Sequence, residues 1–167
     1  MDKTTKYMAS SIIGTAFTFI IALLIKHAFI VIPNAEAEMI LLPTAGSIWE
    51  SLKLIFWPSL LFFMLQFILF GHKDADHLPM AAASLAFGMI AAATAYYFLL
   101  GAIGADCVDI ALIFGMLTTY VSSYLLMRDG ALKSNSAVIT GGVLYTDLIA
   151  MFVYFSFRAP EIPIFIG

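Results

Sequence analysis

The 167-residue sequence has few charged residues, a single cysteine and none of the familiar catalytic motifs. Charged side chains make up 11% of the chain and the net charge is -3, so no basic surface points to a nucleic-acid partner. Cys107 stands alone, which excludes an internal disulfide and a zinc site built on several thiolates. The motifs G-x-S-x-G and H-E-x-x-H and a phosphate-binding glycine loop are absent. We therefore expect no metal and no cofactor.

Apolar residues dominate instead. Hydrophobic side chains make up 62% of the chain, whereas they are about half of a soluble domain. Five continuous apolar stretches each have about the 20 residues that a membrane-spanning helix needs. They lie near residues 10–32, 48–70, 78–100, 108–127 and 137–157. The sequence predicts an all-α, polytopic transmembrane helical bundle, one membrane domain over residues 1–167, in the cell membrane.

The charges between these stretches predict the orientation of the chain. The basic residues that precede the first stretch, follow the second and follow the fourth all fall on one side: Lys3, Lys6, Lys73, Arg128 and Lys133. The opposite side carries Glu36 and Glu38 in its first loop. By the positive-inside rule the N-terminus is cytoplasmic and the C-terminus external. A re-entrant fifth segment, which would reverse the tail, stays open.

Ionisable residues gather near the predicted external side. Lys26 and His27 lie late in the first stretch, while Glu50 and Lys53 share one face at the start of the second. At similar depth, two amines and one carboxylate favour a compact ion cluster, with Asp109 as the nearest further acid. Two simpler readings remain: Lys26 extends to the lipid headgroups, and Glu50 with Lys53 is a local pair.

Asp147 lies near the middle of the fifth stretch, where a charge costs about 2.5–3.5 kcal/mol unless it meets a partner, a proton or water. Thr140 and Tyr154, seven residues before and after it, share its side of the helix. We predict a polar external pocket with Asp147 as its deepest charge, lined by Lys26, His27, Trp49, Glu50, Lys53, Asp109 and Asp147. The alternative is a neutral Asp147 carboxyl used in helix packing.

Two further features have structural interpretations. Ser84, Gly88 and Ala92 follow one another at four-residue steps, a small-residue surface on which another helix can pack closely, either within the monomer or in a homo-oligomer or partner subunit. The histidines and acids of residues 72–77 match no metal motif, so we expect a solvated cytoplasmic turn there, with weak binding of a divalent metal as the alternative.

The segment W-E-S-L-K at residues 49–53 resembles a family of small, functionally uncharacterised bacterial integral membrane proteins, in which N-E-S-x-W-E-H-x-K opens the second span. His27, Pro58 and the tail prolines, Pro160 and Pro163, stand at similar positions. Here Ala45 and Gly46 replace the asparagine and glutamate, and Ser51 replaces the histidine, so no metal or proton-relay role carries over. The resemblance implies a bacterial inner-membrane protein with a polar external pocket, and no substrate.

Three functions are consistent with these features. The first is a small-solute or ion transporter, or a channel-like protein, with an external polar cavity. The second is a non-transporting membrane subunit or scaffold whose small-residue face docks a partner helix. The third is an intramembrane lipid-processing enzyme with Glu50 or Asp147 as acid or base.

Overall fold

The computed structural model describes residues 3–27, 34–44, 46–68, 77–104, 107–129 and 134–165. Within those ranges it contains six helices: α1 (Lys3–His27), α2 (Ala35–Leu41), α3 (Ile48–Gln66), α4 (His77–Ile103), α5 (Val108–Asp129) and α6 (Asn135–Phe157). All of them except α2 are long and apolar enough to cross a membrane. The prediction of an all-helical chain with five candidate spans is confirmed.

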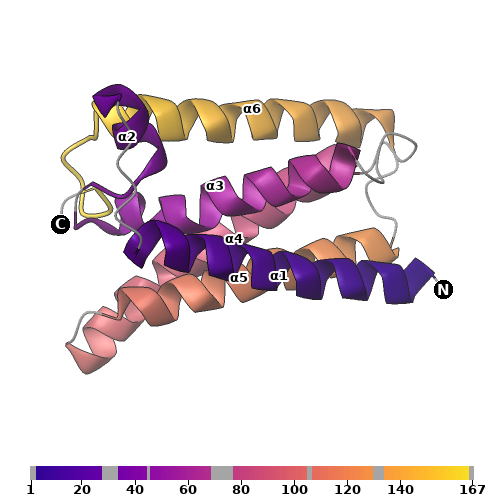
Figure 1. Cartoon of the computed structure of the whole chain (residues 1–167), viewed down its shortest axis with the longest axis horizontal. Helices are drawn as coiled ribbons and strands as arrows, with labels where there is room; N and C mark the ends of the chain where they lie inside the picture. Colours follow the sequence, from indigo (N-terminus) through magenta and orange to yellow (C-terminus); the bar gives the residue numbers. More distant parts are fainter. Residues whose placement is uncertain are drawn as a thin grey trace.

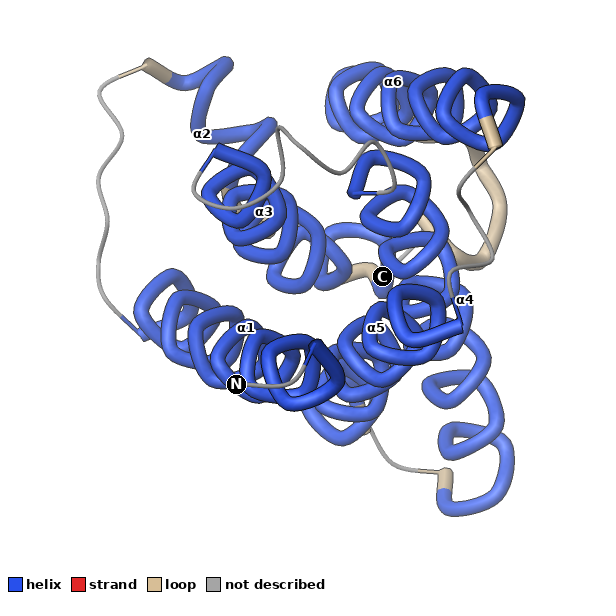
Figure 2. Tube along the Cα trace, turned by 90° about the vertical axis from the view of Figure 1, so that its right-hand side faces the viewer, coloured by secondary structure: helices blue, strands red, loops and turns tan. Residues whose placement is uncertain are grey.

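The five long helices run along the length of the molecule, with the N-terminus at one end and α2 and the C-terminal tail at the other (Figure 1). We call the latter the α2 end; α1 finishes there and α3 begins there. In the end-on view α6 lies on one side of the bundle and α1 on the other (Figure 2). Helix α4 packs against α5 and α6, whereas α1 packs against α3 and α5. Helix α3 packs against α1, α4 and α5 and is the most deeply buried of the five long helices.

Aromatic rings attach α6 and the C-terminal tail to α3. The Phe152 ring of α6 stacks on Phe56 and on Trp49, with centroids 4.1 and 4.6 Å away. Phe165 of the tail packs on Trp49 at 4.7 Å, and the Trp49 amide donates to the Ile164 carbonyl at 3.0 Å. These packed rings bury large apolar surfaces, so α3 anchors both α6 and the C-terminal tail.

The small residues of α4 bring it close to α5. Ser84, Gly88 and Ala92 are all buried. A Cβ atom added to Gly88 would overlap the Thr119 side chain and lie 2.8 Å from the Gly115 carbonyl oxygen. The small-residue face is therefore covered by α5 within the monomer, and this surface is not free to dock a partner helix.

Two parts of the sequence prediction differ from the fold or lie outside it. Helix α2 was not expected; Asn34 caps it by accepting hydrogen bonds from the Glu36 and Ala37 amides. Residues 28–32 of the first predicted span, 69–70 of the second, and the turn at 72–76 lie outside the described residues. The side of the membrane on which each terminus lies stays a prediction.

Candidate functional site

Along α1, polar or small residues follow one another at four-residue steps and form a row that winds slowly around the helix. These residues are Ser10, Gly14, Thr18, Ala22 and Lys26. Thr18 is fully buried and Ala22 is 6% exposed, although both lie in an otherwise apolar span. The three polar members are each eight residues apart, which is about 12 Å along a helix axis. Each of the three meets a polar group from α3 or α5.

The first contact lies at the α2 end. The Lys26 ammonium, at the end of α1, is 2.5 Å from an Asp109 carboxylate oxygen at the start of α5. The two side chains are 41% and 66% exposed, so the pair is open to water or to a ligand. An ion pair this exposed contributes only about 0–1 kcal/mol to stability, which leaves both charges available for binding.

A half-open cavity of about 210 Å³ lies beside this pair. Its polar lining residues are Lys26, His27 and Asp109, and its walls are apolar side chains of α1, α3 and α5: Phe19, Ala22, Leu23, Leu54, Leu112, Ile113 and Met116. An apolar hollow with a few convergent polar groups is the usual form of a small-molecule site. This cavity combines both kinds of lining but is smaller than most such sites, which have about 300–1,000 Å³.

The second contact lies in the interior of the bundle, about two turns before Lys26 along α1. The Thr18 hydroxyl is 2.6 Å from the Tyr120 hydroxyl of α5 and 3.3 Å from the Ser59 hydroxyl of α3. Thr18 and Ser59 are fully buried and Tyr120 is 1% exposed. Gly14 makes room for the Tyr120 ring, because any Cβ there would overlap it. Three helices are thus joined by a closed cluster of hydroxyl groups.

The third contact lies nearest the N-terminal end of the bundle. The Gln66 side-chain amide at the end of α3 donates to the Ser10 hydroxyl at 3.0 Å. Together the three contacts extend over about 24 Å of α1, close to the roughly 30 Å thickness of the hydrocarbon core. The sequence analysis missed Ser59, Gln66 and Tyr120. The even spacing of Ser10, Thr18 and Lys26 was the available signal for the first helix, but it does not identify their partners.

Glu50 and Lys53 form a different and more deeply buried pair. The Lys53 ammonium, with a fully buried side chain, is 2.7 Å from a Glu50 carboxylate oxygen and 2.5 Å from the Met39 carbonyl oxygen. It also donates to the Leu42 carbonyl at 3.4 Å. The same Glu50 oxygen accepts hydrogen bonds from the Thr44 amide and hydroxyl, at 3.0 and 3.2 Å.

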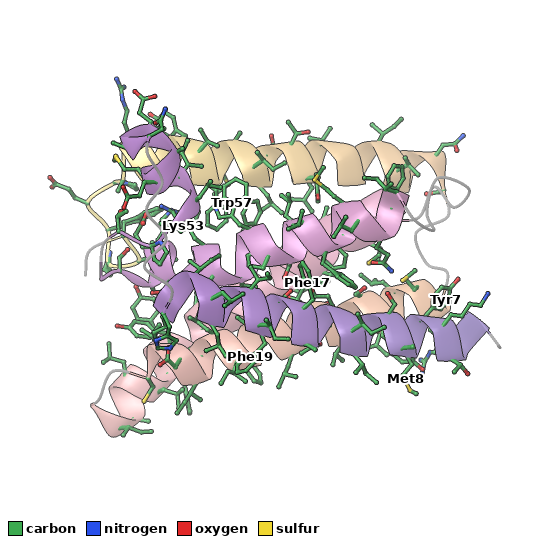
Figure 3. The ribbon with its side chains drawn as sticks, viewed as in Figure 1. Tyr7, Met8, Phe17, Phe19, Lys53 and Trp57 are labelled. Carbon is green, nitrogen blue, oxygen red and sulfur yellow. The ribbon has the colours of Figure 1, made fainter. Side chains whose placement is uncertain are left out.

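This second pair holds α2 against α3. Lys53 and Trp57 lie beside α2 (Figure 3), and the Trp57 indole donates to the Ile40 carbonyl at 2.8 Å. Carbonyl groups at a helix C-terminus carry partial negative charge, so an ammonium group there is stabilising. Glu50 and Lys53 of the W-E-x-x-K segment thus contact α2 and the loop that follows it, and neither of them lines the cavity beside Lys26.

Trp49 and Asp147 also lie apart from that cavity. Trp49 is 7% exposed and is packed among aromatic rings. Asp147 is exposed, because α6 turns Gly141, Leu148 and Phe152 toward the bundle instead. This placement corrects the expected position of Asp147 as the deepest group of the pocket. Both sides of α6 are largely apolar, so hydropathy did not indicate which side faces the protein.

These features define the class: a helical bundle whose five long apolar helices are compatible with a multi-pass membrane protein. The chain belongs to a family of unknown function, DUF6512, whose model matches residues 1–167. No curated protein and no solved structure matches the sequence. The resemblance predicted an uncharacterised family over most of the chain, and the family model matches all of it; the bacterial origin and the role of the W-E-x-x-K segment stay predictions.

Proposed function

We propose that this protein transports a small amphipathic solute along α1, between α1, α3 and α5. The observation that supports the proposal most is the set of three polar contacts, Lys26–Asp109, Thr18–Tyr120–Ser59 and Ser10–Gln66. Polar groups inside membrane spans are costly unless they are paired, and they mark solute pathways. The contacts follow α1 from one end of the bundle toward the other, first with α3, then with both α3 and α5, and last with α5.

The cavity beside Lys26 is the entrance in this proposal. If the N-terminus is cytoplasmic, as the positive-inside rule predicts, the α2 end and its cavity face the exterior. The charged group of a solute would exchange contacts with Lys26 and Asp109, whose mutual contact is weakened by water. The apolar walls would accept the carbon skeleton. The cavity volume of about 210 Å³ restricts the solute to a small molecule.

The Thr18–Tyr120–Ser59 cluster is the barrier in this proposal. Its hydroxyl groups are buried and hydrogen-bonded to one another, so no solute passes while they stay in contact. Transport therefore requires α1 to move relative to α3 and α5. The hydroxyl groups released in that step are then free to contact the solute.

The two other hypotheses have less support. Helix α5 covers the small-residue face on which the scaffold hypothesis depended. Glu50, a candidate acid or base for the enzyme hypothesis, is engaged by Lys53 and Thr44.

The test is uptake into liposomes that contain the purified protein. We would screen small radiolabelled amphipathic anions, cations and zwitterions against protein-free liposomes. Replacing Lys26 by methionine keeps the length of the side chain and removes its charge, so we expect a higher KM for any solute taken up. Ile20→Met is the matched control, because Ile20 is 56% exposed on the same helix and does not line the cavity. Uptake equal to that of empty liposomes across the panel, or unchanged KM in Lys26→Met, would contradict the proposal.

A further inference from the structure

Helix α6 has an exposed face on which polar and apolar residues follow one another at steps of four and three. Its members are Ser136, Thr140, Val143, Asp147, Ala150, Tyr154 and Phe157, and every one of them is exposed. We define these seven residues as the α6 seam. The residues of α6 that are buried, Gly141, Leu148 and Phe152, lie on the other side of the helix. The described parts of the chain therefore leave the seam uncovered.

We propose that the α6 seam is the contact surface between two copies of this chain, which pair as a parallel, two-fold symmetric dimer. Steps of four and three residues are the spacing of the a and d positions of the heptad repeat in a left-handed coiled coil. Six steps cover the whole of α6, so a second helix can follow the seam along its full length. Side chains at these positions of one helix pack into spaces between the residues of the other.

Asp147 supplies the reason for a partner. It lies one residue past the middle of the 23-residue helix, at the depth where an unpartnered carboxyl group is most costly. Among the described residues, the structure gives it no hydrogen bond or ion pair within its own chain. Because the side chain is exposed and has no such partner among the described residues, it is accessible to a group from a neighbouring chain.

A second copy offers that partner at the right depth. Two copies inserted in the same direction are related by a two-fold axis along the membrane normal, so each residue near the axis meets its own counterpart. Asp147 then meets Asp147 of the other copy, and two carboxyl groups that share a proton can hydrogen-bond to each other. Thr140 and Tyr154 repeat this pairing one heptad away on either side. One polar residue at a central a position also fixes the register of a helix pair.

The first test is a count of subunits in lipid bilayers. Full-length protein with a fluorescent label would be reconstituted at low density and its photobleaching steps counted, with two steps expected for most spots. Asp147→Asn should stay dimeric, because amide side chains also pair by hydrogen bonds. Asp147→Leu should raise the dimer dissociation constant by about 3- to 30-fold, the range found for polar contacts between membrane helices.

Thr94→Leu is the control for that experiment, since Thr94 is an exposed polar residue on α4, away from the seam. It should behave as wild type. Single-step bleaching of the wild-type protein at every density would overturn the proposal. So would a dissociation constant in Asp147→Leu equal to that of Thr94→Leu.

The second test is disulfide crosslinking, which reports the contact surface directly. Val143→Cys or Ala150→Cys, in a background where Cys107 is replaced by alanine, should form crosslinked dimers on mild oxidation. Ile90→Cys on α4 is the control, because Ile90 is 63% exposed and lies outside the seam. Crosslinking at Ile90 that equals crosslinking at the seam would overturn the proposal. The solute route along α1 is separate from α6, so failure of either proposal leaves the other standing.

Discussion

The buried Glu50–Lys53 pair is expected to be a main source of stability at the α2 end. Replacing Lys53 by methionine removes the ammonium group but fills nearly the same volume. Three oxygen atoms then lose their donor: one of Glu50 at 2.7 Å, the Met39 carbonyl at 2.5 Å and the Leu42 carbonyl at 3.4 Å. The Glu50 side chain is only 9% exposed, so water replaces little of what is lost.

The expected loss in the free energy of unfolding is about 3 kcal/mol. Removing one partner of a buried ion pair costs about 3–5 kcal/mol. The lower end applies here because Glu50 keeps both hydrogen bonds from Thr44. The double variant Lys53→Met, Glu50→Gln has no uncompensated buried charge, so it should recover part of the free energy of unfolding that Lys53→Met loses.

The chain offers a matched control at the same end of the bundle. Lys26→Met also removes an ammonium group that pairs with a carboxylate, at 2.5 Å from Asp109, but that pair is 41% and 66% exposed. Its expected cost is about 0–1 kcal/mol. The assay is unfolding in detergent micelles by titration with a denaturing detergent, together with the rate of proteolysis in α2, which should rise only in Lys53→Met. Equal losses in the two variants, or undisturbed α2 in Lys53→Met, would refute the reasoning.

Three other substitutions follow from the packing and are measured by the same unfolding assay. Gly88→Leu should lower the free energy of unfolding by about 1–3 kcal/mol or more, because the new leucine side chain would overlap α5. Gly101→Leu is the control and should leave this free energy nearly unchanged, since nothing lies within 4 Å of an added Cβ there. Tyr120→Phe keeps the ring and removes the 2.6 Å hydrogen bond to the buried threonine of α1, so we expect a loss of about 1 kcal/mol, and no loss would contradict the assigned contact. Phe152→Ala should cost about 3–5 kcal/mol because the ring is fully buried, whereas Phe98→Ala, at a ring that is 74% exposed, should cost far less.

The sequence predicted the spans well and the helix partners poorly. Continuous apolar stretches are a direct signal of membrane helices, and five were found. Helix α2 was missed because its seven residues include two glutamates and an apolar run of only three residues. It is held by tertiary contacts with Lys53 and Trp57, which hydropathy does not report.

For the candidate site too, the sequence predicted some of the residues but not the contacts between helices. Lys26, His27 and Asp109 were predicted to share a pocket, and they line one cavity. Thr18 is 41 residues from Ser59 and 102 from Tyr120, so their contact depends on how whole helices pack. In a membrane protein, the lipid-facing and protein-facing sides of a helix are both apolar. Sequence alone therefore could not place Asp147 on the outer side of α6.

The central proposal is that the cavity between α1, α3 and α5 is a hydrated entrance for solute. The most direct test compares cysteines at two neighbouring residues of α1, Leu23 and Leu24, in a Cys107→Ala background. Both side chains are well exposed, at 41% and 51%, but only Leu23 lines the cavity. A charged, membrane-impermeant thiol reagent added from the exterior should label Leu23→Cys readily and Leu24→Cys hardly at all, because the second side chain faces lipid. Equal labelling of the two, or no labelling of Leu23→Cys, would contradict a water-filled entrance at this place.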